Sequence, residues 1–71
     1  MGKDSGGSWL VIYMTHSLLT LESAERMLTE EGFLVRRRTL QRAVSGGGAY
    51  ELCVLESEAQ EARQLIVEKG F

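Results

Sequence analysis

The chain has 71 residues, of which 44% are hydrophobic and 25% are charged, a composition typical of one small folded domain and not of a disordered tail. A formal net charge of −2 gives no general positive field, which argues against nucleic acid or an anionic membrane as a partner. One cysteine and one histidine exclude an internal disulfide and a zinc site with four protein ligands, and they favour a reducing, cytoplasmic setting.

The first predicted element is a strand over Trp9–Thr15. Residues 1–8 are polar and rich in glycine, so we expect a flexible leader ahead of a single domain over residues 9–71. Nearly every position of Trp9–Thr15 is apolar, which predicts a central strand covered on both faces. This apolar run is too short to cross a bilayer, which needs about 20 helical residues.

A helix and a second strand are predicted next. Apolar residues recur at helical spacing over Leu21–Leu28, with Thr20 as the expected N-cap and Gly32 as the C-terminal stop. Residues 33–40 (FLVRRRTL) alternate without a cleanly apolar face, and the charges favour an edge strand.

A third strand and a second helix complete the order. Residues 41–48 form a predicted loop that ends in glycines, and residues 49–55 (AYELCVL) alternate as a strand does. Ser57 and Gln60 match a capping box, which predicts the start of a helix that ends at Gly70.

The order β-α-β-β-α predicts an α+β, ferredoxin-like fold, a three-stranded sheet with two helices on one face. Such a sheet leaves its other face uncovered, and the apolar residues expected there favour a homodimer through the open sheet face or an edge. In the alternative, the leader or the 41–48 loop folds across that face.

The densest positive charge in the chain falls on four arginines, Arg36, Arg37, Arg38 and Arg42. On a strand, Arg36 and Arg38 share one side and Arg37 faces the other. Arginine forks bind phosphate or carboxylate, so this segment is a candidate anion site. The alternative is a solvated edge whose arginines pair with Glu51 or Glu56.

A glycine run and a histidine provide further candidate binding residues. Gly46, Gly47 and Gly48 allow backbone amides to approach an anion, although no Gly-Lys-Ser/Thr motif follows, and a flexible hairpin loop is the alternative. His16 lies at the predicted end of the first strand, where binding loops gather, or it makes only local hydrogen bonds.

The sequence contains no pattern typical of an active site. No pairing of nucleophile and base and no cofactor fingerprint is present, so we expect neither an enzyme nor a cofactor or metal. Cys53 is a candidate thiol if it faces the open side near the arginines, and inert packing within a strand is the alternative.

Three segments together carry a resemblance to a known family. Residues 24–33 (AERMLTEEGF), after His16-Ser17, are similar to a helix that reads A-E-K-L-L-x-x-x-G-I. Residues 42–48 (RAVSGGG) resemble a loop R-E-I-S-S-x-C-G, and residues 65–71 (LIVEKGF) resemble a closing L-L-x-x-x-G-I. These motifs resemble those of small bacterial proteins known as selenium/sulfur carrier-like.

The resemblance implies the same fold and a site around Arg42, Ser45 and Gly48. The cysteine of the family's loop falls on Gly47 here, and Cys53 lies six residues later, so the resemblance does not imply sulfur or selenium transfer.

Three functions follow from the sequence as hypotheses. The first is a non-enzymatic binding or regulatory domain for a small anion or an acidic protein partner. The second is a sulfur carrier or redox accessory protein that uses Cys53, and the third is a purely structural interaction domain. The candidate ligand-binding residues for the first are Arg36, Arg38, Arg42, Ser45, Gly46, Gly47, Gly48 and His16.

Overall fold

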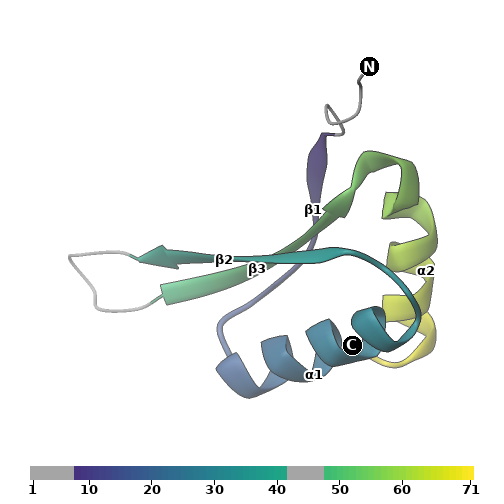
Figure 1. Ribbon diagram of the computed structural model, residues 1–71. Coiled ribbons are helices and arrows are strands. Elements are labelled where there is room, and N and C mark those ends of the chain that lie inside the picture. Colours follow the sequence, from purple (N-terminus) through teal and green to yellow (C-terminus); the bar gives the residue numbers. More distant parts are fainter. Residues whose placement is uncertain (1–7, 42–47) are drawn as a thin grey trace.

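The computed structural model describes residues 8–41 and 48–71, which form three strands and two helices (Figure 1). The elements follow the predicted order β-α-β-β-α, with a 3-10 turn η1 before the last helix. Their bounds are β1 Trp9–Thr15, α1 Leu18–Glu30, β2 Val35–Gln41, β3 Gly48–Leu55, η1 Glu56–Glu58 and α2 Ala59–Glu68.

The strands form one sheet in the order β1-β3-β2. Both β1 and β2 pair antiparallel with β3, so β1 and β2 run parallel to each other with β3 between them. The prediction that β1 is central was wrong, because β1 lies at an edge and β3 is the central strand. The expected cover on both faces of β1 is not found either, because Val11 and Met14 are 36% and 55% exposed. Apolar residues on both faces of a strand therefore specify neither its place in the sheet nor its burial.

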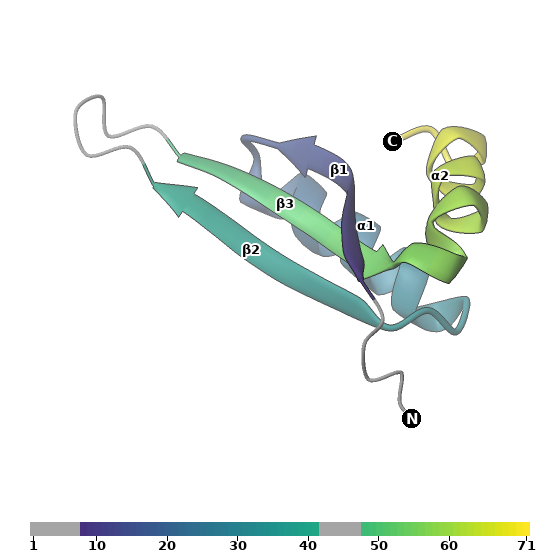
Figure 2. The same cartoon turned by 90° about the horizontal axis from the view of Figure 1, so that it is seen from above.

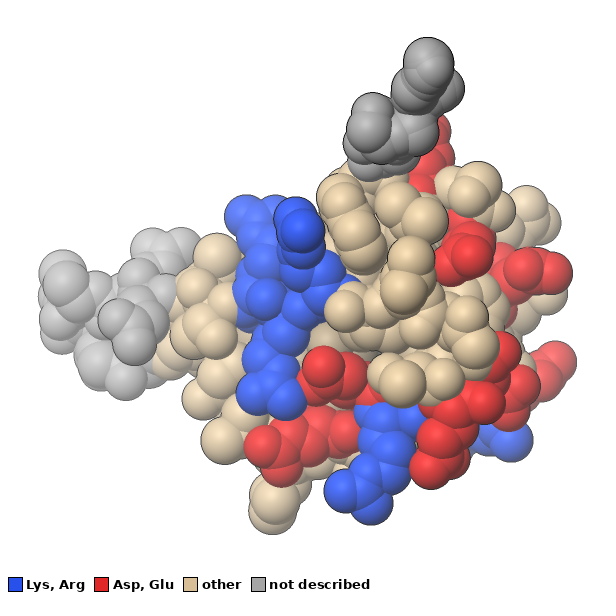
Figure 3. Space-filling model, viewed as in Figure 1, with Lys and Arg blue, Asp and Glu red and all other residues tan. Residues whose placement is uncertain are grey.

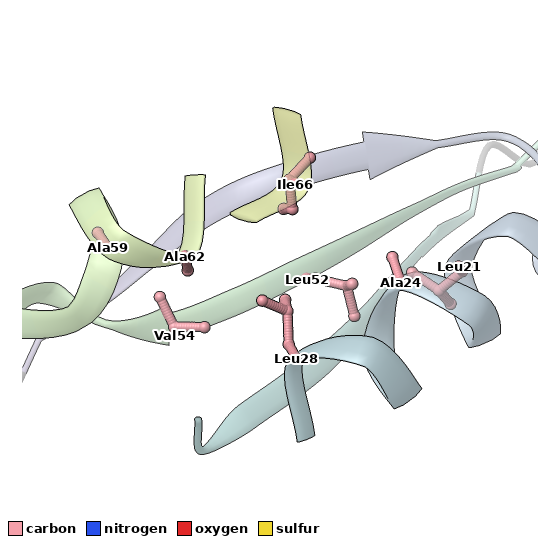
Figure 4. Packing of buried hydrophobic residues seen from close by; sticks show 8 residues of the cluster. All are labelled: Leu21, Ala24, Leu28, Leu52, Val54, Ala59, Ala62 and Ile66. Carbon is pink, nitrogen blue, oxygen red and sulfur yellow. The ribbon is translucent and has the colours of Figure 1, made fainter. Parts of the chain in front are cut away.

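The hydrophobic core lies between the sheet and both helices. Leu52 and Val54 project from β3 toward the helices, and neither is exposed to solvent. Side chains of α1 and α2 point at these two residues (Figure 4). The helical members of the core are Leu21, Ala24, Leu28, Ala59, Ala62 and Ile66. The prediction that both helices cover one face of the sheet is confirmed, and in Figure 2 α1 lies behind the strands.

The start of α1 lies earlier than predicted. Ser17, and not Thr20, is the N-cap, since its Oγ accepts a hydrogen bond of 3.2 Å from the backbone N–H of Thr20. Leu18 and Leu19 in the first turn are 43% and 77% exposed. They therefore add nothing to the buried stripe from which the start was predicted.

The start of α2 also differs from the prediction. The expected capping box of Ser57 and Gln60 is not formed, because residues Glu56–Glu58 make a 3-10 turn and α2 begins at Ala59 without a side-chain cap. Both helices end as predicted at a glycine. Gly32 and Gly70 have φ values of +99° and +84°, which side chains rarely allow.

The predicted leader, residues 1–8, and the predicted loop, residues 41–48, are described only in part. Of the expected leader, Ser8 is described, and its carbonyl oxygen accepts a hydrogen bond of 2.8 Å from the N–H of Glu56. Gln41 and Gly48, the ends of the expected loop, pair with each other across β2 and β3. Residues 1–7 and 42–47 lie outside the described part. Within that part, no helix has the length and apolarity needed to span a membrane.

Substitution Leu52→Ala tests the position of the core. We expect it to lower the free energy of unfolding by about 2–5 kcal/mol, because it leaves a cavity between β3 and both helices. Leu34→Ala is the matched control, since Leu34 is 63% exposed, and it should change stability by less than about 0.5 kcal/mol. Urea unfolding of both variants provides the measurement, and equal losses would contradict this packing.

Candidate binding surface

The strand register divides the side chains of the sheet between two faces. Directly paired residues of antiparallel strands point to the same face. Arg36 and Val11 both pair with Cys53, so these three residues lie opposite the face that carries Leu52 and the helices. We call this side the open face. Its residues are Trp9, Val11 and Met14 from β1, Arg36, Arg38 and Leu40 from β2, and Ala49, Glu51, Cys53 and Leu55 from β3.

The strand β1 contains one irregularity. Its register with β3 shifts between Val11 and Tyr13, so that Ile12 is an extra residue. Ile12 and the adjacent Tyr13 both pack against the helical core. As in other β-bulges, the regular alternation of side chains is interrupted here, and Val11 and Met14 on either side both belong to the open face.

The three consecutive arginines of β2 are divided between the two faces, as their alternation predicted. Arg37 points to the helical side, where its Nη2 and Nε donate hydrogen bonds of 2.6 and 3.1 Å to Oε1 of Glu25 on α1. Hydrogen bonding to Glu25, together with the negative charge of that carboxylate, raises the pKa of Arg37. Arg37 is therefore engaged with α1 and does not belong to the open face.

Arg38 lies on the open face beside Glu51. Its Nε is 3.8 Å from Oε1 of Glu51, which confirms one of the two predicted partners. At that distance the two groups attract each other as charges without forming a hydrogen bond. The Arg38 side chain is 56% exposed and that of Glu51 only 11%. The guanidinium therefore keeps donors that face the solvent.

Arg36 reaches across the central strand to Trp9. Its guanidinium carbon lies 4.6 Å from the centroid of the Trp9 ring, a cation–π distance. Because β2 and β1 lie on opposite sides of β3, this contact spans the open face above the β3 backbone. The sequence did not predict this pair, since only the strand order brings these two residues together over β3.

Cys53 lies between the strands that provide this contact. It pairs with Val11 on one side and Arg36 on the other, and only 1% of its surface is exposed. The thiol is therefore packed within the sheet even though it belongs to the open face. This burial is unlike the partly exposed setting of reactive cysteines.

The open face combines positive charge with exposed apolar surface. Figure 3, seen from the side of β2, shows positive side chains gathered over this strand, whereas the charged side chains over the helices are mainly Asp and Glu with a few Lys and Arg among them. Val11 and Leu40 are 36% and 37% exposed, and Met14 is 55% exposed. Guanidinium groups and apolar side chains therefore lie together on one surface.

The other predicted site residues are described only in part. Arg42, Ser45, Gly46 and Gly47 lie outside the described residues, and Gly48 begins β3. A Cβ at Gly48 would lie 3.2 Å from the carbonyl oxygen of Leu40, so glycine fits closely there. His16 is exposed beyond the end of β1. It follows Trp9 by seven positions, about 23 Å along an extended strand.

The depressions on the helical side of the described residues include three of similar size. One, of about 420 Å³, includes the ion pair of Glu25 and Arg37. Another, of about 330 Å³, lies between the end of α1 and α2 and is lined by Glu31, Phe33, Glu61, Gln64, Leu65 and Glu68. A third, of about 450 Å³, lies on α2 and is lined by Arg63, Gln64, Val67 and Glu68. Over residues 8–41 and 48–71, no group of three or more His, Cys, Asp or Glu side chains is placed to hold a metal ion.

Comparison with known proteins finds no protein that is similar to this chain. No protein-family model matches the chain, and neither a curated protein nor a solved structure shows significant similarity to it. The resemblance to selenium/sulfur carrier-like proteins therefore stays a prediction, and the interpretation of function depends on the open face itself.

The cover over Cys53 can be tested by the reactivity of its thiol. Removing the Arg36 side chain costs a cation–π contact of about 1 kcal/mol, which should make local opening, and hence thiol modification, about fivefold faster in Arg36→Ala. Arg37→Ala is the control, because Arg37 lies on the other face. Reaction with a disulfide reagent under native conditions provides the rate. Equal rates in wild type and Arg36→Ala would show that Arg36 does not protect the thiol.

Proposed function

We propose that this domain is a non-enzymatic binding module whose open face receives an acidic, partly apolar segment of a partner protein. The observation that supports this function most directly is the placement of Arg36 and Arg38 on one face with exposed apolar side chains of β1 and β2. Surfaces that combine arginine with exposed apolar groups are typical of protein interfaces.

Both arginines retain groups that can bind carboxylates. Arg38 lies too far from Glu51 for a hydrogen bond, so its planar fork is available for bidentate pairing. Arg36 is exposed, and its guanidinium carbon lies 4.6 Å from the centroid of the Trp9 ring. A cation–π contact uses the charge of the guanidinium and leaves its N–H groups able to donate to an anion. Two cationic groups are therefore available on the same strand.

The spacing of the arginines favours a protein segment over a small anion. Side chains at i and i+2 of a strand are about 6.6 Å apart along its axis. An extended peptide with acidic residues at every second position repeats this spacing and can place one carboxylate at each arginine. Val11 and Met14 then offer apolar contacts on the far side of β3. A single small anion would contact neither of these apolar residues.

The other two hypotheses make different predictions. A purely structural interaction domain would use the same face without depending on the arginines. A thiol carrier would need access to Cys53, which is 1% exposed.

A titration followed by backbone amide shifts tests the proposed function. The probe is a peptide of alternating glutamate and leucine, compared with a peptide of alternating lysine and leucine and with citrate as a small anion. We expect only the first to shift amides of β1 and β2 together. With about 1 kcal/mol for each exposed ion pair, Arg36→Glu combined with Arg38→Glu should weaken binding at least about tenfold.

Arg63→Glu is the matched control, because Arg63 lies exposed on α2, away from the open face. It should leave the affinity for the glutamate–leucine peptide nearly unchanged. An equal loss of affinity in Arg63→Glu would show that the effect comes from the net charge of the protein and not from Arg36 and Arg38. Citrate binding at these arginines without peptide binding would replace the proposed partner with a small anion.

A further inference from the structure

The two edges of the sheet differ sharply in charge. The β2 edge carries three consecutive arginines, whereas none of the seven residues of β1 is charged. Like charges placed opposite each other destabilise strand pairing, so the arginines discourage a second β2 from adding to that edge. Within the described residues β1 pairs only with β3, and no charge protects its outer edge.

The burial of the core decreases from β3 toward both edges of the sheet, since Val35 of β2 is also only partly buried. Leu52 and Val54 of β3 are fully buried beneath the helices. Leu10, Ile12 and Tyr13 of β1 face the same core but are only partly buried. The hydrophobic layer is therefore left incomplete along the outer edge of β1.

We propose that β1 pairs antiparallel with β1 of a second copy of this chain, so that two three-stranded sheets join into one of six strands. A two-fold axis perpendicular to the sheet produces this arrangement, since it places a strand antiparallel to its own copy. The joined strands satisfy the outer backbone groups of both β1 edges and cover the apolar side chains beside them. This association is independent of the proposed acidic partner.

The irregularity in β1 specifies the register of the pair. Opposite residues must share a face, but Ile12 and Tyr13 both point to the helices. An axis between Ile12 and Tyr13 places Ile12 opposite Tyr13 of the second copy, and both face the helical side. The next pair outward is Val11 with Met14, two exposed residues of the open face. Moving the register by one residue would set open-face residues opposite core-facing ones.

The same axis keeps both open faces on one side of the joined sheet. The apolar residues of the two β1 strands then meet at the centre, and the arginines of each β2 lie at the outer ends. A second copy therefore produces one wide surface with an apolar middle and two positive margins.

Sedimentation equilibrium of the full chain and three double variants tests the proposal. Wild type should be a dimer. Val11→Lys with Met14→Lys places lysine opposite lysine at both pairs and should raise the dimer dissociation constant at least about tenfold. Val11→Lys with Met14→Glu places opposite charges at the same two pairs and should retain the dimer.

Leu34→Lys with Leu40→Lys is the matched control. These residues are 63% and 37% exposed, close to the 55% and 36% of Met14 and Val11, but they lie on the β2 side. The control should remain dimeric. A monomeric wild type at about millimolar concentration, a monomeric control, or a dimer that tolerates the paired lysines would each overturn the proposal.

Disulfide formation gives a second test that does not depend on the lysine variants folding. Val11→Cys and Met14→Cys are made separately in a Cys53→Ala background, because Cys53 pairs with Val11 in the same chain. Mixing the two proteins should give a cross-linked dimer, since paired residues have Cβ atoms close enough for a disulfide. Each protein alone should cross-link much less. Equal cross-linking in the mixture and in either protein alone would overturn the register.

Discussion

The structure depends on β3, which lies between the other two strands and carries the centre of the core. Leu52 and Val54 are the side chains against which both helices pack, and each is fully buried. Both helices pack on the face of the sheet that carries Leu52 and Val54. Within the described residues, no helix lies over the opposite face. A small domain has little apolar surface to spare, so the side chains of the open face must shield β3 themselves.

Long side chains from the two edges provide that shielding. Arg36 reaches Trp9 over the central strand, and Arg38 lies beside the nearly buried Glu51. Cys53, which pairs with Val11 and Arg36, is only 1% exposed, whereas both arginines are exposed. The arginines therefore stabilise the sheet locally and still face the solvent, which is why a surface without a deep cavity is a candidate for binding an extended acidic segment.

Much of the fold follows from local patterns in the sequence. The two-residue period of a strand is enough to separate Arg36 and Arg38 from Arg37, and the structure confirms this division. Strand order is different, because it depends on which strands pair over long distances in the chain. Local patterns do not show which strands pair. For this reason the sequence predicted the wrong position for β1 and did not predict the contact of Arg36 with Trp9. The early start of α1 was missed because its first residues are exposed leucines, which lie outside the buried stripe.

The central claim is that the helices cover only one face of the sheet, and methyl relaxation by a soluble paramagnetic agent tests it most directly. At a protein concentration low enough to keep the chain monomeric, the methyl groups of Leu40 should relax more like those of exposed Val67 than like those of buried Leu52. Leu40 lies on the open face away from β1, so joining of β1 strands would not protect it. Leu40 methyls as protected as those of Leu52 would mean that this face is covered and would contradict the claim.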